Sequence, residues 1–158
     1  MTTADTPQVR AATRADIDTL VDYNAAMAWE TERKTLDRDT LARGIAAVFD
    51  DPRRGFYLVA ERLGEPAGAL LVTYEWSDWR CGDWWWIQSV YVREAHRRSG
   101  VFKRLYASVE DRARSTAGVV GLRLYVEWEN ERAQRTYEAL GMAQAHYHMF
   151  QRSFVPLD

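Results

Sequence analysis

The chain has 158 residues, a length that suits one domain, and 47% of them are hydrophobic and 28% charged. Its formal net charge of -2 argues against a general nucleic-acid binder and a polybasic membrane surface, and no apolar run approaches transmembrane length. One cysteine, Cys81, excludes an internal disulfide and fits a reducing compartment. Because the first residues lack a signal-peptide pattern, we expect a single cytoplasmic domain over residues 1–158.

Six segments have the composition of β-strands, with β-branched and aromatic residues between turn residues. These segments are residues 8–12, 55–62, 67–75, 84–93, 119–127 and 142–154. The second and third are joined by the sequence Leu-Gly-Glu-Pro, which predicts a hairpin. A tryptophan-rich stretch, residues 76–83, is expected to connect the third strand to the fourth.

Four other segments place apolar residues at helical spacing. The first begins after Thr13 and carries its apolar residues up to Ala28, so residues 29–38 are expected to form a loop. The second begins at Asp39 and stops before Pro52. The third and fourth cover residues 101–113 and 130–140. Because helices and strands alternate after a hairpin, the expected fold class is α/β, a mixed sheet with helices on both faces.

A short basic turn, residues 97–100, joins the fourth predicted strand to the third helix. A helix begins with amide groups that lack internal partners and carries a partial positive charge there. Gly100 lets the backbone approach an anion, and Arg97, Arg98 and Lys103 add formal charge. The pattern therefore permits a pyrophosphate site, although a basic turn of this kind is as often simply solvated.

A second segment, residues 130–142, places Asn, Ala, Tyr and Gly at fixed offsets on one short helix. Together the two segments resemble the GNAT acetyltransferase superfamily. Residues 97–102 match the first and fourth positions of its (Gln/Arg)-x-x-Gly-x-(Gly/Ala) phosphate loop, and residues 130–141 match its Asn-x-x-Ala-x-x-x-Tyr-x-x-x-Gly segment. Phe102 departs from the family's Gly or Ala. The order of elements agrees over nearly the whole chain.

The resemblance implies one domain with a largely antiparallel, twisted sheet of six to seven strands that is splayed in the middle. It also implies acetyl-CoA as co-substrate and no metal. The pantetheine arm would pair with the backbone of the fourth strand, and the amides of the turn would hold the pyrophosphate. The cofactor-binding residues implied in this way are Val90, Tyr91, Val92, Arg97, Arg98, Ser99, Gly100, Val101, Phe102, Lys103, Asn130 and Ala133.

The resemblance makes Tyr137 the catalytic candidate, as proton donor to the CoA sulfur; from the pattern alone it would be a core aromatic residue. A backbone amide near Val90 would meet the thioester oxygen. Related diamine acetyltransferases carry an acidic residue on this strand where the chain has Gln88, which can orient a water but cannot act as a base. The carboxylates left as candidate bases, each with a solvated surface charge as its alternative, are Glu30, Glu32, Glu75 and Glu127.

Residues 75–86 hold five of the seven tryptophans. Aromatic faces attract cations, so Glu30, Glu32 and Asp78 could border a pocket for an amine, while most of the tryptophans are expected in the core or a dimer contact.

Three further residues have simpler interpretations. Cys81 reads as an incidental thiol, and His146 and His148 lack enough companions for a metal site.

Three functions remain open at this point. The first is an N-acetyltransferase, by resemblance a homodimer, that moves an acetyl group from acetyl-CoA to a primary amine of a small molecule by direct attack in a ternary complex. The second is a catalytically weak acyl-CoA-binding or regulatory module, which Gln88 would favour. The third is an aromatic-rich ligand-binding domain without CoA. The pairing of the basic turn with the tyrosine-bearing helix argues against the third.

Overall fold

The computed structural model describes residues 2–156. The chain forms two compact units, one that runs up to Leu124 and one that begins at Tyr125. The prediction of a single domain over residues 1–158 stays a prediction, and each unit is described by itself.

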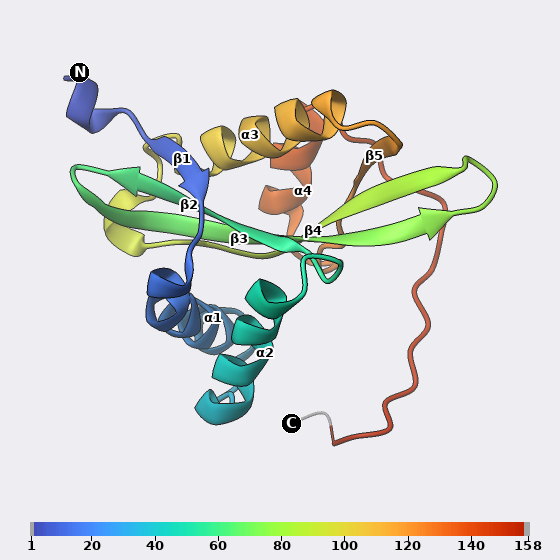
Figure 1. The fold of residues 1–158 in the computed structure, drawn as a ribbon, viewed down its shortest axis with the longest axis horizontal. Helices are drawn as coiled ribbons and strands as arrows, with labels where there is room; N and C mark the ends of the chain where they lie inside the picture. Colours follow the sequence, from blue (N-terminus) through green and yellow to red (C-terminus); the bar gives the residue numbers. More distant parts are fainter. Residues whose placement is uncertain (1, 157–158) are drawn as a thin grey trace. The chain divides into compact units, whose positions relative to one another are not determined.

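The first unit is built on a five-stranded sheet in the order β1-β2-β3-β4-β5 (Figure 1). The pairings β1–β2, β2–β3 and β3–β4 are antiparallel, and β4–β5 is parallel. A mixed, largely antiparallel sheet is therefore confirmed, with fewer strands than the six to seven expected. The strands are β1 (Gln8–Ala11), β2 (Phe56–Arg62), β3 (Glu65–Ser77), β4 (Gly82–Val92) and β5 (Val119–Arg123).

Two hairpins organise the middle of the sheet. Arg62 pairs with Glu65 across a two-residue loop, and both loop residues, Leu63 and Gly64, have positive φ (56° and 78°). Positive φ at both positions gives the loop the right-handed twist that a tight hairpin requires, and the predicted hairpin is confirmed. The connection expected at residues 76–83 forms the second hairpin, and it is shorter than expected because β3 and β4 pair as far as Ser77 and Gly82.

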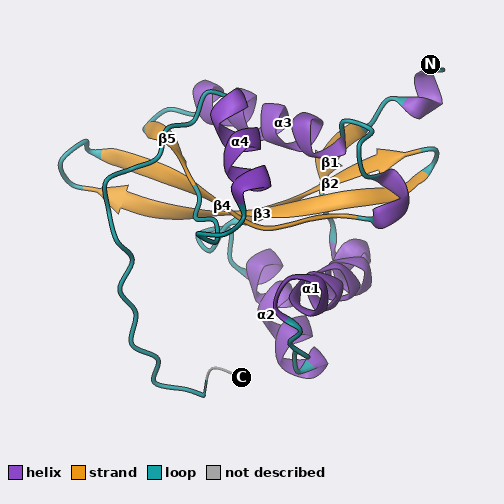
Figure 2. Ribbon diagram, turned by 180° about the vertical axis from the view of Figure 1, so that it is seen from behind, coloured by secondary structure: helices purple, strands orange, loops and turns teal. Residues whose placement is uncertain are grey.

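Helices cover both faces of the sheet, as expected (Figures 1 and 2). α1 (Ile17–Glu32) and α2 (Arg38–Asp50) pack together on one face, and α3 (Val101–Ser115) packs on the other. Short 3-10 segments precede α1 and α3 and lie near the amino terminus; they are η1 (Thr3–Asp5), η2 (Arg14–Asp16) and η3 (Glu94–His96).

The loop expected at residues 29–38 is partly wrong, because α1 continues through Trp29 to Glu32. Those four residues contain no glycine or proline, so nothing local stops the helix. α1 ends at Arg33, which adopts a left-handed conformation with φ of 54°. The extension places Glu30 on the helix, where it meets residues of the functional site.

The core lies between the sheet and its helices. Leu58, Val59 and Ala60 of β2 are fully buried, as expected for a central strand covered on both faces. The apolar stripe predicted for the third helix is confirmed, since Val101, Leu105, Val109 and Ala113 are all buried.

The parallel ladder between β4 and β5 is short. It runs from Asp83 to Trp86 on β4, and the last pair joins Trp86 to Arg123. β4 then continues to Val92, and within the described residues that stretch pairs only with β3. The second half of β4 therefore keeps one edge outside the sheet's ladders.

The second unit contains α4 (Glu131–Ala139), close to the helix predicted at residues 130–140. Asn130 caps it, its side-chain oxygen accepting from the Ala133 N–H at 3.1 Å. At the other end, Gly141 N–H donates to Glu138 C=O and Met142 N–H to Tyr137 C=O, which together form a Schellman motif with φ of 95° at Gly141. Both ends follow local signals in the sequence.

The strand predicted at residues 142–154 is wrong, and the strand predicted at 119–127 ends early, at Arg123. An apolar pattern favours a strand, but a strand needs a neighbour to pair with, and the described residues supply none to this segment. Its large side chains are exposed as a result. They include Tyr147, Met149, Phe150 and Phe154.

Candidate functional site

The basic turn lies where η3 gives way to α3. Arg98 and Gly100 both adopt left-handed conformations, with φ of 62° and 81°. The first hydrogen bond of α3 runs from the Arg104 N–H to the Gly100 C=O at 3.0 Å, and no side chain caps the helix at Gly100. The amides of residues 101–103 therefore precede the helical ladder, in a curved backbone of the kind that binds anions.

Two of the three cations predicted for the turn, Arg98 and Lys103, are exposed there. The third, Arg97, is engaged elsewhere. Its Nη2 lies 2.6 Å from Glu30 Oε2, and its Nε donates to the Val92 carbonyl at 2.9 Å. Its guanidinium also lies over the ring of Tyr91, 5.6 Å from the centroid. Arg97 therefore links the turn to α1 and β4.

Glu30 is the centre of this contact. Besides the Arg97 guanidinium, Glu30 accepts a hydrogen bond from the Tyr91 hydroxyl at 3.0 Å. Burial disfavours the ionised carboxylate, but the hydrogen bonds from Arg97 and Tyr91 outweigh it and hold the pKa of Glu30 below its ordinary value. A paired carboxylate with a lowered pKa is a poor general base, which weakens Glu30 as a candidate for that role.

Phe102 stands where the family motif has a small residue. Its ring lies 6.3 Å from that of Tyr106, one turn further along α3, with 48° between the ring planes. The Phe102 side chain thus packs along the helix, and the bulky residue is compatible with the turn that precedes it.

The strand residues of the predicted site surround a β-bulge. Tyr91 pairs with Ala69 and Gln88 with Leu71, so β4 has one residue more than β3 between these positions. Ser89 has a φ of 52°, a left-handed conformation rare for a non-glycine residue within a strand. A bulge leaves its extra residue outside the ladder. The distortion falls beside Val90, where a backbone amide is expected to meet the thioester oxygen.

Beyond the bulge, β4 turns backbone groups toward its open edge. The Arg93 N–H donates to the Ala67 carbonyl at 2.9 Å, so the groups of the preceding residue, Val92, point away from β3. The Val92 carbonyl accepts from Arg97 instead. Gln88 uses its Nε2 to donate to the Thr73 hydroxyl at 2.5 Å, which leaves its side-chain oxygen as an acceptor.

The other predicted carboxylates make separate local contacts. Glu75 pairs with Arg123 at 2.5 Å, and Asp78 accepts from the Trp79 N–H at 2.9 Å in the hairpin turn. Glu32 is exposed in the last turn of α1, and Glu127 belongs to the second unit. The structure does not gather these groups into one acidic cluster in either unit.

The tryptophans divide between core and surface. Trp85 is buried, whereas Trp76 and Trp79 are exposed near the hairpin tip, Trp79 by 89%. Trp84 already has cations over its ring, Arg123 at 4.0 Å and Arg80 at 5.2 Å from the centroid. The face of the Trp84 ring thus already makes cation–π contacts with arginines of the same chain.

Tyr137 lies on α4 in the second unit and is half-buried. Burial raises the pKa of the Tyr137 hydroxyl above an ordinary value that already lies well above neutral, so the group carries its proton at neutral pH. Asn130, the predicted companion on the same helix, acts as its cap.

The remaining candidates have simple surroundings. Cys81 is an exposed free thiol, and His148 stacks on Trp128 with ring centroids 6.2 Å apart. No group of three or more His, Cys, Asp or Glu residues suited to a metal occurs in the described part of the chain. None of the helices over residues 2–156 is long and apolar enough to cross a membrane.

Comparison with known proteins places these features in context. The sequence model of the acetyltransferase (GNAT) family matches residues 18–142, which include the turn, β4 and α4. The crystal structure of a possible acetyltransferase from Clostridium difficile 630 is 39% identical, with a TM-score of 0.88, and the match covers 96% of this chain and 100% of that one.

Two other matches have lower sequence identity. The mycothiol acetyltransferase of Corynebacterium aurimucosum is 29% identical over 128 residues, a match that covers 79% of this chain but only 42% of that protein. The glucosamine-6-phosphate N-acetyltransferase of Arabidopsis thaliana shares the fold, with a TM-score of 0.73, 20% identity, and coverage of 96% of this chain and 100% of that one.

Proposed function

The chain belongs to the GNAT acetyltransferase family, and from that premise we propose that it transfers an acetyl group from acetyl-CoA to a primary amine of a small molecule. The observation that carries the proposal is the turn before α3, where uncapped helix amides and the exposed Arg98 and Lys103 meet. Helix amides and cations together suit the pyrophosphate of CoA.

The open edge of β4 supports the rest of the cofactor site. Residues 90–92 lie beyond the β4–β5 ladder, so an extended pantetheine arm can pair with those backbone groups that face the open edge, as a further strand does. The Val92 carbonyl is held by Arg97, so the pantetheine either pairs near Val90 or displaces that side chain. The amide freed by the bulge at Ser89 would donate to the thioester oxygen.

Proton transfer is assigned to two residues. Tyr137, whose hydroxyl is protonated at neutral pH, would donate to the departing sulfur. An alkylamine arrives mostly protonated at neutral pH, and the strand offers Gln88 rather than an acid. Because Nε2 of Gln88 is committed to Thr73, we expect its side-chain oxygen to orient the amine or a water that removes the proton.

The second candidate function, a CoA-binding or regulatory module, rests on two observations that leave the site without an evident general base. Gln88 cannot accept the proton, and Glu30 is neutralised by Arg97. A cytoplasmic homodimer remains a prediction. Exposed aromatic residues such as Trp79 and Phe150 support the dimer.

Acetyl-CoA and an amine panel test the function directly. We expect acetyl-CoA to raise the Tm, because a ligand at about 100 times its Kd stabilises the folded chain by about 2.7 kcal/mol. At least one of a panel of polyamines, amino acids and aminoglycosides should then release free thiol. Stabilisation without thiol release with any amine would favour the module, and no shift at millimolar acetyl-CoA would contradict both.

Charge reversal at the turn tests the pyrophosphate site. In the double variant Arg98→Glu, Lys103→Glu, two attractions to phosphate become repulsions, each worth about 1 kcal/mol at 4 Å in water. After screening, we expect the Kd for acetyl-CoA to rise about 30-fold at low salt and less at high salt. Calorimetry measures this, with Arg114→Glu in the last turn of α3 as the control. Equal Kd values for the double variant and the control would reject the site.

A further inference from the structure

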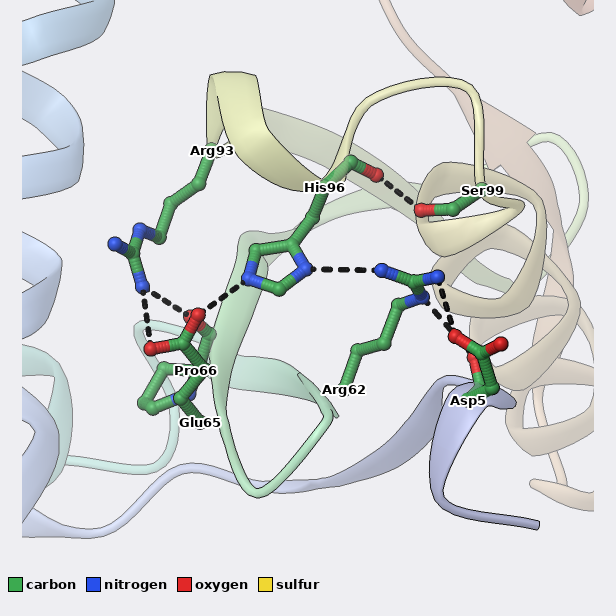
Figure 3. Close-up of polar contacts among 7 residues, drawn as sticks. All are labelled: Asp5, Arg62, Glu65, Pro66, Arg93, His96 and Ser99. Carbon is green, nitrogen blue, oxygen red and sulfur yellow. Dashed lines mark hydrogen bonds and ion pairs between the residues drawn. The ribbon is translucent and has the colours of Figure 1, made fainter. Parts of the chain in front are cut away.

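A buried histidine directly precedes the basic turn. His96, the last residue of η3, is only 3% exposed, and it is one of three buried polar or charged residues in the described chain, with Asp16 and Asn24. The side chain of His96 meets residues from β2 and β3, which lie far away in sequence (Figure 3).

Both ring nitrogens of His96 have partners. Nε2 lies 2.7 Å from Glu65 Oε1, and Nδ1 lies 3.4 Å from a guanidinium nitrogen of Arg62. A guanidinium only donates hydrogen bonds, so Nδ1 must be the acceptor and Nε2 must carry the proton that Glu65 accepts. These partners select one tautomer of a neutral imidazole and fix the orientation of its ring.

The partners of His96 are themselves held. Arg62 donates from Nη2 to Asp5 Oδ1 at 2.5 Å and from Nε to the Asp5 carbonyl at 3.0 Å. On the other side, Glu65 Oε2 lies 3.3 Å from Nη1 of Arg93, the residue that follows β4 (Figure 3). Two cations and two anions thus surround the imidazole, so the cluster around it has balanced charge.

The backbone of His96 shapes the turn that follows. Its N–H donates to the Arg93 carbonyl at 2.8 Å, and its carbonyl accepts a hydrogen bond from the Ser99 hydroxyl. Between these contacts Arg98 adopts its left-handed conformation, which costs an L-residue roughly 1–2 kcal/mol. Such a conformation persists only when several surrounding contacts hold it in place. Next to the turn, the fixed ring of His96 provides that support.

We propose that His96 is a positioning residue for cofactor binding, held by Glu65 and Arg62, which keeps the turn at residues 97–100 in its anion-binding shape. In this role the buried His96 would act through the turn and not by contact with the substrate. The inference rests on the proposed binding of acetyl-CoA at this turn and deepens it. An ordered turn binds more tightly because the loop loses less conformational freedom when the cofactor arrives.

Three variants test the role, with one matched control. His96→Leu removes both ring contacts, His96→Gln keeps an N–H that can reach Glu65, and Glu65→Gln keeps an acceptor for the ring. Asp50→Asn breaks the exposed ion pair between Arg14 and Asp50 and serves as the control. We expect His96→Leu to raise the Kd and KM for acetyl-CoA about tenfold, with kcat at saturation within twofold. His96→Gln and Glu65→Gln should lie within about threefold of the native chain, as should Asp50→Asn.

A measurement without cofactor separates this proposal from the proposed function. Amide hydrogen exchange at His96, Arg97 and Arg104, whose N–H groups are hydrogen-bonded on either side of the turn, should accelerate about tenfold in His96→Leu and stay unchanged in Asp50→Asn. If the native chain fails to bind acetyl-CoA, the function is wrong, and the exchange rates still decide the role of His96. Unchanged exchange, an unchanged Kd, or equal losses in kcat and affinity that His96→Gln does not restore would overturn the positioning role.

Discussion

Replacing Tyr137 with phenylalanine is expected to lower kcat by about 100-fold, the lower end of what a positioned general acid contributes. The substitution removes one hydroxyl and keeps the ring, so α4 should pack as before. If the hydroxyl protonates only the departing thiolate, the Kd for acetyl-CoA should stay within about twofold of the native value. Steady-state kinetics and calorimetry on the same preparations measure both quantities.

The control for this experiment is Tyr147→Phe, which removes an exposed hydroxyl from the same unit. We expect no change in kcat for this variant. Because burial raises the pKa of Tyr137, the native enzyme should retain its acid through the ordinary titration range of tyrosine, near pH 10. A native kcat for Tyr137→Phe would reject the acid role and leave Tyr137 as a packing residue.

Gly55→Ala is expected to give the largest loss of stability among glycine-to-alanine substitutions in the first unit. Gly55 has a φ of 146°, and a Cβ added there would lie 2.1 Å from the Val72 carbonyl oxygen of β3. Because the clashing atom belongs to the backbone of β3, the clash can be removed only if the start of β2 moves. We expect the free energy of unfolding to fall by about 3 kcal/mol or more, which denaturant titration measures.

The chain offers a matched glycine as the control. Gly44 lies within α2, and a Cβ added there meets nothing within 4 Å. Gly44→Ala should therefore raise the free energy of unfolding by about 0.5–1 kcal/mol, the usual gain of alanine over glycine in a helix. Equal effects of the two substitutions would contradict the close approach of Gly55 to β3.

The elements that could be predicted from the sequence are those with local causes. The α3 stripe follows from the spacing of its apolar residues, and α4 follows from an asparagine at one end and Gly141 at the other. The Leu-Gly turn defines the β2–β3 hairpin for the same reason. The turn before α3 could be predicted because a helix start carries a partial positive charge in any protein, and the neighbouring glycine and arginines are visible in the sequence.

The elements that could not be predicted depend on distant partners. The pairing of Arg97 with Glu30 has no local signal, because Glu30 lies 67 positions earlier in a segment predicted to be a loop. A contact between Arg97 and phosphate stays a prediction. The left-handed Ser89 has no local signal, since serine favours no such conformation in a strand. The contacts of His96 could not be predicted, because a single histidine in a basic stretch does not indicate a partner such as Glu65, which lies 31 residues earlier. Residues 142–154 have the pattern of a strand but no ladder in the described chain.

The brevity of the β4–β5 ladder has an energetic consequence. β5 is an edge strand joined to the sheet by four registered pairs, whereas β2 has neighbours along both sides. Local opening begins where few hydrogen bonds must break together, so β5 should part from the sheet far more readily than β2 does. A molecule that binds along β4 next to this strand therefore contacts a weakly held edge of the sheet, and its binding should reduce the local opening of that edge.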